Sequence, residues 1–172
     1  MTPEQFIARI GANRLFHFTD RRNLGSIREH GLLSWRGLQE RGISPAAPGG
    51  NEWSHDADEL WGLDRYVHLC FFNEHPMEYR ARQDGRIEHS VFLKIQPEVL
   101  RIPGVLFSAD VSNKSGVPIL DMSAAAEALD LDVVYQRLDW RDPSIQARRQ
   151  VAKKYEVLVP DHVPLHLILG LK

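Results

Sequence analysis

The sequence is poor in cysteine and in long apolar runs. Its single cysteine, Cys70, excludes an internal disulfide and a zinc site built from cysteine alone. The apolar stretches His68–Phe72 and Leu165–Leu171 fall far short of the roughly 20 residues that cross a bilayer. The first residues, MTPEQFIARIG, lack the basic start and apolar run of a secretory signal. We therefore expect a cytoplasmic protein that has no membrane segment.

The chain also lacks a strong charge of either sign and the common catalytic motifs. Its formal net charge is −2, whereas nucleic-acid binding needs clustered positive charge. Basic residues are dense only locally, as in Arg80–Arg86 and Arg148–Lys154, and these runs either line one groove or are scattered over the surface. There is no phosphate-binding glycine loop, HExxH or GxSxG, and the histidines form no familiar metal motif, so we predict no metal site.

What remains is the composition of an ordinary globular domain. Hydrophobic residues make up 43% and charged residues 26% of the 172 residues. The length fits a single domain, residues 1–172, with enough aromatic bulk for a real core.

Hydrophobic periodicity and turn residues predict a mixed α+β fold. Helices are predicted over Thr2–Ile10, after Asp20 as far as Gly31, and over Pro76–Arg82, Ser123–Leu129 and Pro143–Lys153. Strands are predicted over Arg14–Thr19, Tyr66–Phe72, Ser90–Ile95, Gly104–Phe107, Tyr155–Val159 and Pro164–Leu171. Residues 35–64 read as a long loop, with a short helix near Asp56–Trp61. Loops of this length inside a domain are often functional.

A few polar residues interrupt the predicted strands. His17 and Thr19 alternate with aromatic residues and so share one side of the first strand. His17 is either a satisfied core histidine or a site residue. Glu156 lies in an otherwise apolar strand, where it either points outward from an edge strand or is buried and needs partners. Cys70 is expected to be a buried, inert thiol.

Three segments together resemble the DarT family of NAD-dependent DNA ADP-ribosyltransferase toxins, which have the ADP-ribosyltransferase fold. The first is Leu15–Thr19 followed by a helix that ends in Gly-Leu-Leu at residues 31–33. The second is Tyr66–Phe72 followed by Pro76-Met77 and Tyr79. The third is Tyr155–Val159, with Glu156 in the place of the family's catalytic carboxylate. Their order spans nearly the whole chain.

The resemblance implies an α+β fold with central mixed or antiparallel sheets, peripheral helices and a long substrate loop. It implies that NAD is the substrate and that Glu156 binds the 2′-hydroxyl of the ribose that becomes cationic, as in glycosidases. An arginine of the family lies in the interval that holds Arg36, Arg41 and Arg65, and Arg41 is our candidate. The implied NAD-binding residues are His17, Thr19, Asn23, Leu33, Tyr66, Phe71, Met77 and Tyr79.

The resemblance further implies that the acceptor is a base of single-stranded DNA. Trp53 is expected to stack on bases, and Arg148, Arg149 and Lys153 are expected to hold phosphates. It also implies a toxin of a toxin–antitoxin or anti-phage system, paired with an antitoxin that removes ADP-ribose. Two alternatives stay open: an ADP-ribosyltransferase acting on RNA, protein or a small molecule, and a non-catalytic domain that binds a nucleotide or a partner.

Overall fold

An antiparallel sheet dominates the fold, in the strand order β6-β5-β7-β3-β1-β4-β9. The computed structural model describes residues 1–50 and 52–171, with the side chains of residues 52–54 outside the description. Two short strands, β2 and β8, pair separately. The strands are β1 (Leu15–Asp20), β2 (Leu32–Leu33), β3 (Tyr66–Cys70), β4 (Ser90–Ile95), β5 (Leu106–Ser108), β6 (Ile119–Leu120), β7 (Glu156–Pro160), β8 (His162–Val163) and β9 (Ile168–Leu169).

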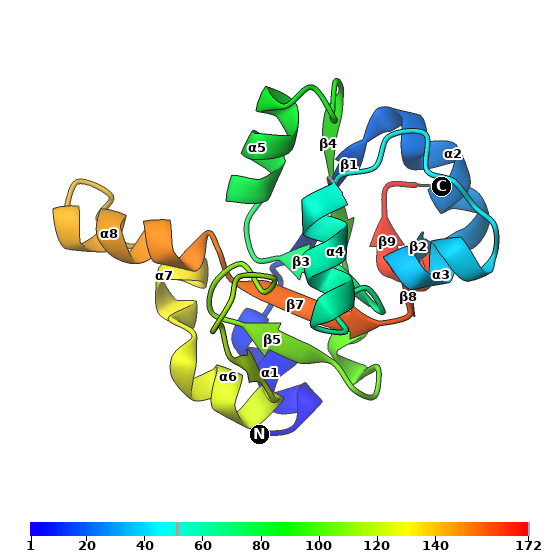
Figure 1. The fold of residues 1–172 in the computed structure, drawn as a ribbon. Helices are drawn as coiled ribbons and strands as arrows, with labels where there is room; N and C mark the ends of the chain where they lie inside the picture. The colour runs from blue at the N-terminus through cyan, green and yellow to red at the C-terminus, as the bar shows by residue number, and fades with distance from the viewer. Residues whose placement is uncertain (51, 172) are drawn as a thin grey trace.

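Helices surround this sheet, and their starts follow local capping rules. The side chain of Thr2 accepts the backbone N–H of Gln5 and forms a full capping box with it, and Asp142 and Pro143 likewise open α8. The helices are α1 (Pro3–Ile10), α2 (Leu24–His30), α3 (Trp35–Glu40), α4 (Glu52–Leu60), α5 (Pro76–Gln83), α6 (Met122–Ala128), α7 (Leu131–Tyr135) and α8 (Pro143–Ala152), with 3₁₀ turns η1 (Arg21–Asn23), η2 (Pro97–Arg101) and η3 (Leu165–Leu167). Figure 1 shows α8 extending outward from the rest of the chain.

The main core lies between the β5–β7 part of the sheet and the helices α1, α6 and α7. Phe6 of α1 stacks on Phe107 of β5 with ring centroids 4.9 Å apart, and both side chains are fully buried. Val157 of β7 pairs with Phe107 and joins the same core. Because side chains alternate along a strand, the neighbouring Glu156 faces the opposite side of the sheet.

The sheet consists of two halves held together at one point. Strands β1 and β4 pair over Leu15–Asp20, and β3 and β7 pair over Tyr66–Cys70, but β1 and β3 share only the pair Phe16 and Cys70. Beyond that pair the two central strands part. Figure 1 shows α4 in front of these central strands.

The predicted α+β class with an antiparallel sheet is confirmed, whereas several local predictions are wrong. The segment 35–64 contains two helices: α3 was not predicted, whereas α4 includes most of the short helix predicted near Asp56–Trp61 and starts before it. Ser34 caps α3 by accepting the N–H of Gly37. The predicted last strand, Pro164–Leu171, is instead the turn η3 followed by the short strand β9, since Pro164 cannot donate to a sheet ladder. Strand β8 precedes it and is additional to the prediction. Asp121, not Ser123, caps α6, and α7, β2 and β6 are additional to the predicted elements. In the part of the chain that is described, no helix has both the length and the apolar character to cross a membrane.

Candidate active site

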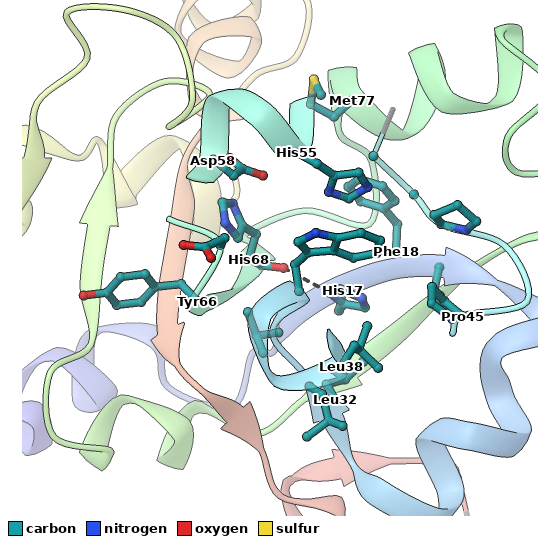
Figure 2. Close-up of a pocket in the computed structure, with 18 of the residues that line it drawn as sticks. His17, Phe18, Leu32, Leu38, Pro45, His55, Asp58, Tyr66, His68 and Met77 are labelled. Atoms are coloured by element: carbon teal, nitrogen blue, oxygen red, sulfur yellow. Dashed lines mark hydrogen bonds between the residues drawn. The ribbon is translucent and has the colours of Figure 1, made fainter. Parts of the chain in front are cut away.

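A cleft of about 240 Å³ lies where β1 and β3 part. Strand β1 contributes His17 to Thr19, β3 contributes Tyr66 to His68, and β7 contributes Glu156 at the floor. Figure 2 shows His17 of β1 and His68 of β3 on one side of the cleft, with Asp58 and His55 of α4 facing them. The long segment between α2 and β3 thus forms one wall of the cleft.

Glu156 is buried in the interior of the sheet, with 5% of its surface exposed. It opens β7, which lies between β5 and β3, so the outward-pointing edge position does not occur. The carboxylate oxygen Oε2 accepts the backbone N–H of Ser112 at 3.2 Å and also its hydroxyl. Nδ1 of His68 lies 3.4 Å from the same oxygen, and Nε2 of His75 lies 3.5 Å from Oε1. A buried carboxylate surrounded by donors is poised to remain charged.

The electrostatics of this cluster assign different charge states to its members. Burial alone would raise the pKa of Glu156, but the hydrogen bond and charge of His68, together with His75 and Ser112, lower it. Burial alone would lower the pKa of His68, but Glu156 and Asp58 raise it to about 9. Burial lowers the pKa of His75. Near pH 7, Glu156 is an anion, His68 a cation and His75 neutral.

His17 closes the gap between the two halves of the sheet. Its Nδ1 donates to the backbone oxygen of His68 at 2.9 Å, at the point where the β1–β3 ladder has ended. Burial lowers the pKa of His17 to about 4, so the ring is neutral near pH 7. With Nδ1 donating, Nε2 is an acceptor. His17 therefore offers the cleft a hydrogen-bond acceptor, rather than being only a core residue.

Thr19 and Asn23 tie the end of β1 to the loop that follows α3. The side-chain amide of Asn23 donates to Thr19 Oγ1 at 3.1 Å and to the backbone oxygen of Ala47 at 2.7 Å. Its amide oxygen accepts the N–H of Ala47 at 3.0 Å. Both predicted residues line the cleft, and Asn23 fixes the backbone of its rim.

The structure places the remaining predicted NAD-binding residues in two groups. Leu33, Tyr66 and Met77 line the cleft. Phe71 and Tyr79 do not: Phe71 is buried against Tyr135 and Tyr155 in the core. Tyr79 is 59% exposed, because residues two apart on a helix, such as Met77 and Tyr79, point to nearly opposite sides.

Arg41 does not reach the cleft either. It is exposed at the C-terminal cap of α3, a helix that the sequence did not predict. Among the described residues, no arginine or lysine lines the cleft. Two arginines contact lining residues. The guanidinium of Arg36 binds Asp64 through Nε–Oδ2 and Nη2–Oδ1 distances of 2.9 and 3.2 Å, and that of Arg86 donates to the backbone oxygen of Gly49.

The predicted DNA-binding cations lie on α8 and just after it, and each has an acidic partner. Arg148 pairs with Asp130 at 2.6 Å. Arg149 and Lys153 both contact Glu74, at 3.0 and 3.1 Å. Arg149 also lies between the rings of Phe72 and Trp140, 4.5 and 4.7 Å from their centroids. The side chain of Trp53 lies outside the described residues.

Sequence reasoning missed His75, Ser112 and Asp58 as site residues and did not commit to His68. His75 and Ser112 belong to connections, and only the tertiary fold brings them to Glu156. Asp58 lies on α4, within the short helix predicted near Asp56–Trp61, but the prediction did not place its side chain in the site. The one usable signal was His68, a polar residue in an apolar strand.

An aromatic stack lines another part of the cleft. The ring of Trp35 stacks on the ring of His55 with centroids 3.8 Å apart, and both residues line the cleft.

Comparisons with known proteins agree on one family. A family model described as "ssDNA thymidine ADP-ribosyltransferase, DarT" matches residues 16–171. The structure is similar to that of Thermus sp. 2.9 DarT in complex with ADP-ribosylated ssDNA, with a TM-score of 0.66 and 20% identity over 91% of this chain and 78% of that one.

Two further solved structures share the fold. Thermus sp. 2.9 DarT in complex with NAD+ gives a TM-score of 0.60 and 22% identity, covering 92% of this chain and 80% of that one. Thermosipho africanus DarTG in complex with ADP-ribose gives a TM-score of 0.65 and 18% identity, covering 91% of this chain and 42% of that one. No curated protein sequence matches the chain.

Proposed function

The chain belongs to the DarT family of ssDNA thymidine ADP-ribosyltransferases, and we propose that it transfers ADP-ribose from NAD to a thymine of single-stranded DNA with Glu156 as the catalytic carboxylate. The enzyme is an NAD-dependent ADP-ribosyltransferase. The observation that carries the residue assignment is the buried, charged Glu156 at the floor of the cleft between β1 and β3.

NAD would lie in this cleft along β1. The neutral ring of His17 and the hydroxyl of Thr19 would receive the adenosine-side ribose and the nicotinamide amide, with Asn23 holding the rim. Leu33, Tyr66 and Met77 would supply apolar contact. Phe71, Tyr79 and Arg41 have no place in this proposal because their side chains do not line the cleft. Arg36, paired with Asp64, and Arg86, bound to the backbone oxygen of Gly49, are better placed than Arg41.

The chemistry follows from the charge of Glu156. The bond between nicotinamide and the ribose breaks with its electron pair leaving on nicotinamide, and the ribose becomes a cation. A carboxylate that accepts a hydrogen bond from the ribose 2′-hydroxyl stabilises this transition state more strongly as its positive charge grows. Thymine in DNA has one ring N–H, so its nitrogen forms the new bond and its proton passes to Glu156. Ser112 and His68 approach Oε2, so we assign both contacts to Oε1, which His75 faces at 3.5 Å.

Glu156→Gln tests the assignment. The purified protein is incubated with labelled NAD and with single-stranded DNA, duplex DNA, RNA or bulk protein. We expect label on single-stranded DNA, and a loss of about a hundredfold to a thousandfold in the variant. Glu127→Gln, which changes an exposed glutamate on α6, is the matched control.

Other outcomes would replace parts of the proposal. Label on RNA or protein would keep the mechanism and change the acceptor. Neither label nor nicotinamide release from the wild type would leave a domain that binds a nucleotide or a partner. Full activity in Glu156→Gln would remove the glutamate from catalysis.

We also infer, from the family, that the protein acts as a toxin. ADP-ribose on a pairing atom of thymine would block replication, so a cell that makes the enzyme needs a partner that removes the modification. We propose an antitoxin with ADP-ribose-removing activity, and residence in the cytoplasm, where the DNA is. The similarity to Thermosipho africanus DarTG, solved in complex with ADP-ribose, supports such a pairing.

A further inference from the structure

Three histidines surround the base of the cleft, and their contacts distinguish them. His17 donates from Nδ1 to a backbone oxygen, and His75 accepts the N–H of Met77 at its own Nδ1. Each of these rings needs only one proton to satisfy its contacts. His68 is different, because both of its nitrogens face acceptors. Nδ1 lies 3.4 Å from Glu156 Oε2 and also 3.4 Å from Ser112 Oγ, whose own proton is donated to that carboxylate. Nε2 lies 3.4 Å from the backbone oxygen of Leu63.

We propose that His68 is a positioning residue for the transfer reaction, and that as a doubly protonated ring it holds the Glu156 carboxylate charged and fixes its orientation. This inference rests on the proposed function. The ring is 29% exposed and opens onto the cleft, whereas the Glu156 side chain is 6% exposed. His68 thereby connects a buried anion to the solvent side of the site.

The charged and titratable groups around the pair come from every neighbouring element. Asp58 of α4 lies on the cleft side and favours the charged ring. His75, which precedes α5, and Cys70 of β3 face the carboxylate, and His17 of β1 contacts the His68 backbone. Asp58 is the acidic group among these neighbours, and burial raises the pKa of its carboxyl. Burial raises the pKa of the Cys70 thiol, which therefore stays neutral.

The ion pair matters because the reaction needs a charged carboxylate in a buried place. Without a cation beside it, a buried glutamate gains its proton at higher pH. A protonated Glu156 neither stabilises a ribosyl cation nor takes the proton of the acceptor base. A nearby opposite charge shifts a carboxyl pKa by about 1–3 units, so removal of His68 is expected to raise the pH at which activity is lost.

The first test reads the ion pair without using activity. Long-range ¹H–¹⁵N NMR of the histidine rings reports the protonation of each nitrogen. We expect His68 to carry protons on both nitrogens at pH 7.5 in the wild type and to lose one of them in Glu156→Gln. A His68 ring that is neutral at pH 7.5 in the folded wild type overturns the inference, whether or not the protein modifies DNA.

The second test measures transfer to single-stranded DNA across pH 5–8 for His68→Ala, with the exposed His166→Ala as the control. We expect kcat to fall about tenfold or more at pH 6, the acid limb to move up by about one unit, and KM for NAD to change by less than about threefold. An unchanged acid limb in a folded His68→Ala protein contradicts the inference.

Added imidazole tests whether His68 acts through its positive charge or only by filling space beside Glu156. In His68→Ala, imidazole can enter from the cleft and take a proton beside Glu156, while pyrazole has the same size and stays neutral. We expect imidazole to restore activity and pyrazole not to. Equal rescue by both rings would reduce His68 to a packing residue. If the wild type labels no DNA at all, the proposed function fails, and the NMR result still decides the state of His68.

Discussion

At the end of β1, the carboxylate of Asp20 is fully buried and receives five hydrogen bonds. Arg22 donates its backbone N–H, Nε and Nη2, and the backbone N–H groups of Glu88 and His89 donate from just before β4. This cluster fixes the strand end that carries Thr19 into the cleft. We expect Asp20→Asn to lower the free energy of unfolding by about 2–4 kcal/mol, because the charge-assisted bonds are removed and buried donors are left unpaired. Denaturant unfolding measures the difference.

The stability that the Asp20 carboxylate contributes should depend on pH in a definite direction. The hydrogen bond from the Arg22 side chain is the largest cause that holds the pKa of Asp20 well below its usual range. A depressed pKa contributes stability that is complete above the unfolded value of roughly 4 and is lost as the pH falls below it. The gap in unfolding free energy between wild type and Asp20→Asn should therefore narrow from pH 6 to pH 3. A gap that is constant with pH would mean that charge plays no part.

Single residues also show what a sequence can and cannot predict about a site. Glu156 and His17 are predictable because a charged or polar residue in an apolar strand needs a reason. His75 and Ser112 are not, because their approach to Glu156 depends on how two connections fold over the sheet. The position of Arg41 outside the cleft was not predictable either, because an arginine in a segment without periodicity has no pattern that fixes where it points.

At the scale of elements, strong local signals predict the structure correctly. The predicted strand Ser90–Ile95 has the observed bounds, and α8 ends within a residue of its prediction, since alternation and an Asp-Pro start are local. Helices α3 and α4 escape full prediction for the opposite reason. The segment that joins α3 to α4 is rich in glycine and proline, which predicts a loop. The two short helices beside it depend on tertiary packing rather than on a local signal.

Helix α8 carries a prediction of its own. Arg149 and Lys153 share the carboxylate of Glu74, which is 42% exposed, and such half-exposed pairs contribute at most about 1 kcal/mol. A DNA phosphate can therefore displace Glu74. If α8 binds the backbone of single-stranded DNA, Glu74→Gln frees both cations and should tighten binding. Fluorescence anisotropy at several salt concentrations measures the effect.

Removing the two cations, instead of their acidic partner, should change DNA affinity in the opposite direction. Arg149→Gln with Lys153→Gln should weaken DNA binding and flatten the dependence of log K on log salt by about 0.7 for each phosphate that the variant no longer neutralises. Changing Arg14, which precedes β1 at the end opposite Thr19, is the control for a general decrease in positive charge. Equal salt slopes in all variants would show that α8 does not contact DNA.

At the scale of the whole molecule, the site is a consequence of a sheet that does not close. Two well-paired halves, β1 with β4 and β3 with β7, meet at the single pair Phe16 and Cys70. The strands could be predicted one by one, but their parting could not, because it depends on pairing between residues far apart in sequence. The parting leaves room for a ligand and places Glu156 at the bottom of it.

An enzyme that attaches ADP-ribose to the bases of DNA should be harmful to the cell that makes it. We expect induced expression of the wild type to arrest growth and start a DNA-damage response, because a modified thymine cannot pair during replication. Glu156→Gln should be tolerated at equal protein level, and co-expression of a hydrolase that removes ADP-ribose from DNA should restore growth of the wild type. Growth curves and a damage reporter measure both effects. Arrest that persists with Glu156→Gln would point to toxicity from binding, and active protein that accumulates without a growth defect would remove the toxin role while leaving the transferase activity in place.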